Sequence, residues 1–308
     1  MRRLIIDTDT ASDDAVAIMM AVAADDVQVE ALTIVAGNVT LAQGSRNARY
    51  TLQLCQADVP VHEGCDRPLQ REPSTAEWFH GQDGMSDQNY PAPHAQPLQG
   101  HAVTALLERF GAAPGEIDLV TLGPLTNIAT ALAINPQLAQ WVRHCYVMGG
   151  AAATLGNVTP AAEYNFWCDP EAARRVMHSG MNLTLVGWEL SCGDATLDDQ
   201  EIQDILALDN DRARLAIDSN RTALQAVRSL QGQTGLALAD PVAMAVALYP
   251  EIVTKAESLY VDIETHGEMT RGMSVVDVNK VMGKAANATV CFAIDNARWK
   301  QELLRALR

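Results

Sequence analysis

Short apolar runs alternate with segments of helical periodicity along most of this chain, and this alternation restricts the possible fold most strongly. The run 4–6 is followed by apolar residues at helical spacing from Ala15 to Val22. Strands are also expected at 31–36, 117–122, 145–148, 183–186, 259–263 and 289–294, and helices at 41–57, 125–134, from 170 onward and at 297–307. Such alternation produces right-handed crossovers. We therefore predict an α/β fold with an open, mainly parallel sheet flanked by helices.

The chain shows no linker, composition break or internal repeat, so we predict a single domain over residues 1–308. Segment 58–100 is rich in proline, and segment 149–169 also lacks a regular pattern. Long irregular segments in compact α/β proteins often form the walls of functional sites. We expect 58–100 to be a loop that covers the site, together with polar helices in 198–238.

Composition excludes two classes of partner. The chain has 22 Lys and Arg against 38 Asp and Glu, a formal net charge of −16, which repels polyphosphate and argues against a nucleic-acid polymer as partner. No apolar stretch approaches the length of a membrane helix, and the opening residues become acidic too early for a secretory signal peptide. A cytoplasmic protein without a membrane partner is therefore expected.

Four aspartates follow the first expected strand: Asp7, Asp9, Asp13 and Asp14. Ligands of open parallel sheets bind at the carboxyl ends of the strands, where these residues are expected. Four neighbouring carboxylates repel one another, and a hard divalent cation with oxygen ligands would offset that repulsion. The residues alone also permit a solvated acidic turn that favours the dipole of the following helix.

The block Asp7–Ala15 resembles the N-terminal signature of the inosine–uridine nucleoside hydrolases. Similar blocks follow in family order over nearly the whole chain: Val35–Asn38, Leu122–Asn127, Val147–Gly150, Ala162–Phe166, Asp169–Ala173 and Asp240–Pro241. The resemblance implies a calcium-dependent enzyme that hydrolyses the N-glycosidic bond of a ribonucleoside to ribose and free base. It also implies a homo-oligomer, either a tetramer or a dimer.

The resemblance further implies a role for each matching residue. The Ca²⁺ ligands would be Asp9, Asp14, Asp240 and the backbone carbonyl of Leu122, with Asp7 supporting them. Asp9 would also be the general base on the attacking water. The substrate-binding residues would be Asp13, Asn38, Met148, Asn157, Glu163 and Asn165. Breaking the bond to ribose builds positive charge on the sugar, which carboxylates and amide oxygens stabilise.

The sequence departs from the family pattern where many members have a histidine that protonates the departing base. That position is Ala239, which has no proton to donate. His80, in segment 58–100, resembles a second histidine of pyrimidine-preferring members and is the leading substitute. The alternatives are Trp188, Glu189 or no acid at all. The preferred base therefore stays open between a pyrimidine, a modified base and a base that leaves readily.

Two other functions remain alternatives. A haloacid dehalogenase-type phosphatase also begins with a strand and Asp-x-Asp, which would make Asp7 a nucleophile and Asp9 an acid, with Mg²⁺. That family expects Thr or Val where Ala11 stands, and no later lysine-and-paired-aspartate motif is evident. The second alternative is a riboside-binding protein that, with Ala239 in place of histidine, turns its ligand over weakly or not at all.

Overall fold

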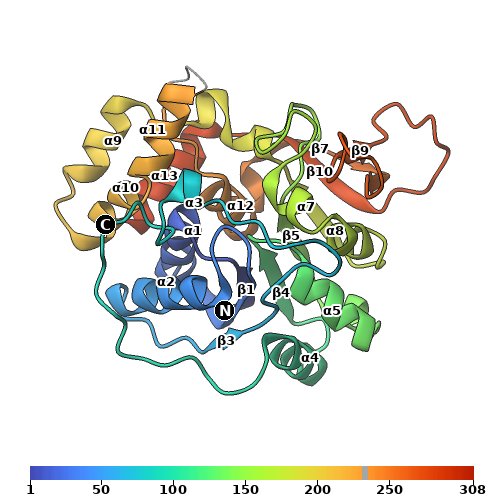
Figure 1. Cartoon of the computed structure of the whole chain (residues 1–308), viewed down its shortest axis with the longest axis horizontal. Coiled ribbons are helices and arrows are strands. Elements are labelled where there is room, and N and C mark those ends of the chain that lie inside the picture. The colour runs from blue at the N-terminus through green and yellow to red at the C-terminus, as the bar shows by residue number, and fades with distance from the viewer. Residues whose placement is uncertain (231–234) are drawn as a thin grey trace.

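The computed structural model describes residues 1–230 and 235–308, and within them eight strands form one open sheet in the order β3-β2-β1-β4-β5-β6-β10-β7 (Figure 1). Neighbouring strands are parallel except β10 and β7, which are antiparallel. The predicted open, mainly parallel sheet is thus confirmed. The strands are β1 Arg2–Thr8, β2 Val27–Ile34, β3 Val61–Glu63, β4 Ile117–Thr121, β5 Cys145–Met148, β6 Leu183–Val186, β7 Val253–Leu259 and β10 Ala288–Ile294.

Helices cover both faces of the sheet. Successive residues of a strand point to opposite faces, so each strand contributes side chains to two separate cores. On β1, Ile6 packs into one core with α1, α2, α10, α12 and α13, and Ile5 packs into the other with α4, α5, α6 and α8. The helices are α1 Ser12–Ala23, α2 Leu41–Leu54, α3 Glu77–His80, α4 Ala102–Ala112, α5 Thr126–Ile134, α6 Leu138–Trp141, α7 Tyr164–Cys168, α8 Pro170–Met177, α9 Asp199–Leu206, α10 Asp211–Asp218, α11 Arg221–Leu230, α12 Ala239–Leu248 and α13 Asn296–Ala306. Both faces of the sheet are therefore buried, which agrees with the continuous apolar runs of its strands.

The expected strand 259–263 differs from the structure. Its apolar run is divided at Tyr260, so that Leu259 ends β7 in the large sheet while β8 Val261–Ile263 pairs with β9 Ser274–Val276 in a separate hairpin. A run of buried apolar residues does not reveal which sheet each part joins.

The segments expected to be irregular contain short elements. Segment 58–100 includes β3 and α3, and 149–169 includes α7. Segment 198–238 forms α9, α10 and α11, with residues 231–234 outside the described residues. Within the described ranges, no helix is long and apolar enough to cross a membrane.

The order of the strands reverses between β1 and β4, because the chain proceeds from β1 to β2 and β3 on one side and continues through β4, β5 and β6 on the other. The loops that leave β1 and β4 diverge at such a switch point and open a crevice at the carboxyl edge of the sheet. The loop after β1 carries Asp9, Asp13 and Asp14, and the loop after β4 begins with Leu122. The topology therefore brings these residues to one crevice.

Asp169 ties segment 58–100 to this frame, and we predict that its replacement lowers stability. Its buried carboxylate accepts hydrogen bonds from the Ala172 amide at 3.0 Å, the Thr126 hydroxyl at 2.7 Å and the Leu69 amide at 2.8 Å. Asp169→Ala leaves these donors without their acceptor and should lower the free energy of unfolding by about 3 kcal/mol.

The matched control is Asp295→Ala, since Asp295 caps α13 through one bond to the Arg298 amide and is exposed. Its loss should cost about 1 kcal/mol. Urea unfolding measures both values, and equal losses in the two variants would contradict the role of Asp169.

Candidate active site

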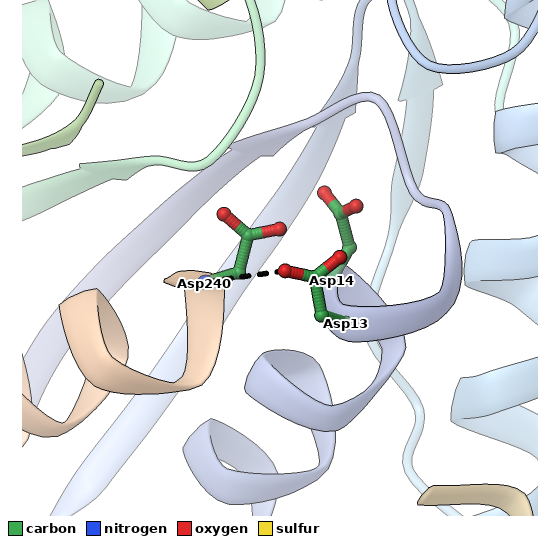
Figure 2. A group of neighbouring side chains, drawn as sticks. All are labelled: Asp13, Asp14 and Asp240. Carbon is green, nitrogen blue, oxygen red and sulfur yellow. Dashed lines mark hydrogen bonds between the residues drawn. The ribbon is translucent and has the colours of Figure 1, made fainter. Parts of the chain in front are cut away.

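Three carboxylates face one another at the carboxyl edge of the sheet (Figure 2). Asp13, Asp14 and Asp240 each offer a carboxylate oxygen, and these oxygens lie within 4.8 Å of one another. Asp13 and Asp14 belong to the first turn of α1, whereas Asp240 belongs to the first turn of α12. All ten residues of α12 are buried, and the helix packs against α1, so tertiary packing brings together acids from distant parts of the chain.

Asp14 is held rigidly within the turn that follows β1. One carboxylate oxygen accepts from the Thr8 hydroxyl at 2.5 Å and the other accepts from the Ala11 amide at 2.8 Å. Burial raises the pKa of Asp14 to about 6, and the charge of Asp13 contributes to the rise. Burial, with the charges of Asp14 and Asp13, also raises the pKa of Asp240 well above its usual value.

Asp9 is fully buried beside this group, between two glycines. Its Oδ2 accepts from the Asn38 amide at 2.5 Å, whereas Oδ1 is buried without a hydrogen-bond partner. A Cβ at Gly37 would lie 2.1 Å from Oδ2, and one at Gly123 would lie 2.8 Å from Oδ1, so only glycine fits at either position. Burial and the charge of Asp14 raise the pKa of Asp9 well above its usual value.

The donor set fits a hard divalent cation. An unpartnered buried carboxylate oxygen costs free energy, as does the repulsion within a buried group of carboxylates. Asp9 provides such an unpartnered oxygen, and Asp13, Asp14 and Asp240 form the group of carboxylates that repel one another. The structure groups Asp13, rather than Asp9, with the other two acids, while Asp14 lies close enough to Asp9 for its charge to raise the pKa of Asp9.

Asp7 is fully buried and does not line the pocket. Its Oδ2 accepts from the Thr33 hydroxyl at 2.6 Å and from the side-chain amide of Asn127 at 2.9 Å. Burial raises the pKa of Asp7 to about 7. Asn127 also donates to the carbonyl of Ile34 and accepts from the Cys65 amide, so it joins the loops after β2, β3 and β4 beneath the acids.

Glu163 and Asn165 form the opposite side of the site. Glu163 caps α7, and its carboxylate accepts from the amides of Gly150 and Asn165, both at 2.8 Å. Burial raises its pKa to about 7. The side chain of Asn165 donates to the carbonyl of Leu122 at 2.7 Å and to that of Met148 at 3.3 Å. A carbonyl oxygen has a second lone pair, which leaves Leu122 able to accept another partner.

These residues line a pocket that holds about 860 Å³ of empty space, part of it open to solvent. Of the residues selected from the sequence, the structure brings nine to its surface: Asp13, Asn38, His80, Leu122, Met148, Asn157, Glu163, Asn165 and Asp240. Asp7, Asp9 and Asp14 lie behind that surface and are fully buried. The side-chain oxygen of Asn157 accepts from the Tyr164 amide at 2.9 Å, which fixes it beside Glu163.

The rest of the pocket is largely apolar. Its remaining lining residues include Ala76, Trp78, Phe79, Val158, Trp188, Ala223, Val227, Leu236, Ala237 and Ala239. Trp78 is 58% exposed, so this aromatic side chain borders the opening rather than filling the core. The pocket therefore combines an acidic side with an apolar, partly aromatic side.

Among the residues proposed to replace the missing histidine, His80 and Trp188 line the pocket and Glu189 does not. The carboxylate of Glu189 accepts from the amides of Ala152 and Ala153. His80 ends α3 and is buried, and its Nδ1 lies 2.8 Å from the Ser12 hydroxyl. Burial lowers the pKa of His80, although the nearby charge of Asp13 opposes that change.

Three polar residues at the site were not assigned a role from the sequence. Asn127 organises the loops, Ser12 contacts His80, and Asn220 lines the pocket. Asn127 lies within the family-like block Leu122–Asn127 and Ser12 within the block Asp7–Ala15, and these blocks were the available signals. Nothing in the local sequence pairs Ser12 with a residue 68 positions later.

Comparisons with known proteins agree with this geometry. Residues 4–301 match the family model described as inosine-uridine preferring nucleoside hydrolase. The chain is 38% identical over 308 residues to a pyrimidine-specific ribonucleoside hydrolase of Shewanella woodyi, covering 99% of this chain and 98% of that one. It is 34% identical over 304 residues to a non-specific ribonucleoside hydrolase of Escherichia coli, covering 99% and 97%.

Solved structures give the same result. A plant nucleoside hydrolase superposes with a TM-score of 0.94 at 29% identity, covering 99% of this chain and 98% of that one. An inosine-guanosine nucleoside hydrolase superposes with a TM-score of 0.90 at 32% identity, covering 100% and 99%. The sequence match, the shared fold and the acidic pocket together show that this chain belongs to the inosine-uridine preferring nucleoside hydrolase family, whose members hydrolyse the N-glycosidic bond of nucleosides.

Proposed function

We propose that this nucleoside hydrolase depends on Ca²⁺ and releases ribose from ribonucleosides, pyrimidine ribonucleosides among them. The observation that carries the proposal is the buried, unpartnered Oδ1 of Asp9 beside the carboxylates of Asp14 and Asp240, at the acidic side of a pocket whose other side is apolar. The proposal that pyrimidine ribonucleosides are among the substrates draws on the Shewanella woodyi relative and on His80.

The proposed Ca²⁺ ligands are Asp9, Asp14, Asp240 and the Leu122 carbonyl. Asp7, which is fully buried, is proposed to support Asp9. Ca²⁺ accepts many carboxylate and carbonyl oxygens, whereas Mg²⁺ tends to retain its waters, so an all-oxygen set of this kind favours Ca²⁺. When bound, the cation would lower the pKa of a neighbouring water molecule and would bind the vicinal hydroxyls of a ribose.

Asp9 is the proposed general base. Its Oδ2 is held by the Asn38 amide, which leaves Oδ1 as the oxygen without a hydrogen-bond partner. Burial and the charge of Asp14 raise the pKa of its carboxyl group, which strengthens it as a base relative to an exposed aspartate. Asp9 therefore takes a proton from the attacking water as the water approaches the anomeric carbon.

Asp13, Asn38, Met148, Asn157, Glu163 and Asn165 are the proposed substrate-binding residues. The backbone amides that hold Glu163 orient its carboxylate before the substrate arrives. Carboxylate and amide oxygens around the sugar stabilise the positive charge that develops as the C–N bond breaks. The apolar side, with Trp78 at the opening, would receive the base.

His80 is the proposed partner of the departing base. Ala239 lies at the start of α12 on the pocket surface, and its methyl group cannot donate a proton. His80 lies on the same surface and carries a ring nitrogen, Nε2, that has no hydrogen-bond partner among the described residues. This accessible nitrogen supports the role of His80.

We predict that stabilisation by Ca²⁺ increases with pH. The pKa of Asp14 is raised to about 6, and those of Asp9 and Asp240 are raised further above their usual values. In the unfolded chain these three carboxyl groups lose their protons at a lower pH than in the folded protein. The unfolding free energy of the ion-free protein should therefore fall as the pH rises from about 4 through about 6. Ca²⁺ binds the ionised carboxylates, so the melting shift in excess CaCl₂ should be larger at about pH 8 than at about pH 5.

Asp240→Asn is the test variant for that shift and should respond weakly to CaCl₂ at both pH values. MgCl₂ provides the comparison of ions. Equal melting shifts of the unsubstituted protein at the two pH values would contradict cation binding by these acids.

We predict that the protein releases reducing sugar from a panel of ribonucleosides and that EDTA abolishes the release. Asp9→Asn should lower kcat about 10³-fold, because it removes the general base. Asp25→Asn, at an exposed position beyond the C-terminal end of α1 and thus at the opposite end of that helix from Asp13, should match the unsubstituted protein.

The same panel distinguishes the alternative functions. A riboside-dependent melting shift without turnover would favour a binding protein, and release of phosphate from a phosphate ester would favour a phosphatase. Full activity of Asp9→Asn would refute the assignment of the base.

We predict that His80→Ala separates substrates by their leaving group. Turnover of uridine should fall about 10²-fold, whereas turnover of 4-nitrophenyl riboside, whose leaving group needs no stabilisation, should change little. His94→Ala, an exposed histidine in the same segment, is the control. Equal losses on both substrates would show that His80 does not act on the leaving group.

A further inference from the structure

We propose that Ser12 is a positioning residue that donates its hydroxyl proton to Nδ1 of His80 and thereby keeps the ring proton on Nε2, facing the base. This inference rests on the proposed function, since it concerns the leaving-group side of the same pocket. It adds a residue for which the family-like blocks suggest no role. Its basis is a hydrogen bond of 2.8 Å between the Ser12 hydroxyl and Nδ1 of His80.

The direction of this hydrogen bond follows from the surroundings of Ser12. The side chain is fully buried at the start of α1, and among the described residues Nδ1 of His80 is the only partner of its Oγ. A buried hydroxyl needs an acceptor for its proton. If Nδ1 carried the ring proton and donated it to Oγ, the Ser12 proton would have no acceptor. Donation by Ser12 satisfies both groups.

A donating Ser12 selects one of two forms of the ring. A neutral imidazole has one N–H, and the hydrogen bond made by one nitrogen decides which nitrogen carries the proton. Burial lowers the pKa of His80, which favours the neutral ring. With Nδ1 accepting from Ser12, the proton lies on Nε2, the nitrogen without a partner on this pocket-lining residue.

The backbone of His80 is fixed independently of Ser12. Its amide donates to Ala76 at 3.0 Å, and its carbonyl accepts from the Ser86 amide at 2.7 Å. The hydroxyl of Ser86 donates to the carbonyl of Ser219 at 2.7 Å and accepts from the Thr222 amide at 2.9 Å, which attaches the loop to α10 and α11. Loss of the Ser12 hydroxyl should therefore release the ring while the loop stays in place.

The protonated Nε2 has a defined use in the reaction. As the C–N bond breaks, both electrons of the bond move to the base, and negative charge grows on its acceptor atoms. An Nε2–H donor stabilises that charge through a hydrogen bond while keeping its own proton, and the released base takes a proton from solvent. The ligand class is thus a nucleoside whose base presents a hydrogen-bond acceptor toward His80.

Nitrogen NMR of the protein labelled with ¹⁵N in its histidine rings tests the tautomer directly. His80→Ala identifies the signals of His80 by their loss. The unsubstituted protein should show a protonated Nε2 and an unprotonated Nδ1, and Ser12→Ala should shift the ring toward a mixture of both forms. A protonated Nδ1 in the unsubstituted protein, or an unchanged ring in Ser12→Ala, would overturn the proposal.

Kinetics give the second readout. Ser12→Ala should lower kcat for uridine about tenfold, with little change in KM, and should leave 4-nitrophenyl riboside unaffected. Ser12→Thr retains the hydroxyl and should restore most of the rate and the Nε2–H form. Ser45→Ala is the matched control, because Ser45 is also a fully buried helical serine but its hydroxyl has no hydrogen-bond partner in the described part of the chain.

These outcomes separate the two proposals. Equal rate losses on both substrates in Ser12→Ala, or equal losses in Ser12→Ala and Ser45→Ala, would overturn the positioning role. If no nucleoside is hydrolysed at all, the proposed function fails, whereas the ring NMR still decides the role of Ser12.

Discussion

The repulsion among buried carboxylates is the constraint on which the rest of the site depends. Asp9, Asp14 and Asp240 are removed from water and brought close together, and their pKa values rise as a result. No lysine or arginine is among the residues that line the pocket in the described part of the chain. A mobile divalent cation can therefore neutralise these acids, whereas a fixed ion pair with a side chain would occupy the space that a sugar needs.

The two sides of the pocket divide the chemistry between them. Polar groups on the acidic side are oriented in advance by backbone amides, as Glu163 and Asp9 illustrate. The apolar side contributes shape and aromatic surface, and among its described residues His80 is the one that carries an imidazole ring. Preorganised dipoles suit the sugar, whose charge changes during the reaction, while an apolar surface suits a flat base.

Much of the fold could be predicted because each buried strand is a distinct apolar run. β5 and β6 begin and end where the runs 145–148 and 183–186 predicted, since both faces of these strands are covered. The division at Tyr260 could not be predicted, because the apolar run continues while the chain changes sheets. The family was recognisable from its motif blocks, but the contact of Ser12 with His80 depends on packing between distant segments, and Ala239 shows only which donor is missing.

The helix α12 has a consequence for how the molecule is made. Asp240 belongs to that helix, whereas Asp9 and Asp14 lie more than 220 positions earlier in the sequence and emerge from the ribosome well before it. β10, which joins β6 to the edge strand β7, is translated later still. A nascent polypeptide therefore exposes Asp9 and Asp14 long before Asp240 exists, and hydrolytic competence can arise only after α12 and β10 have been synthesised.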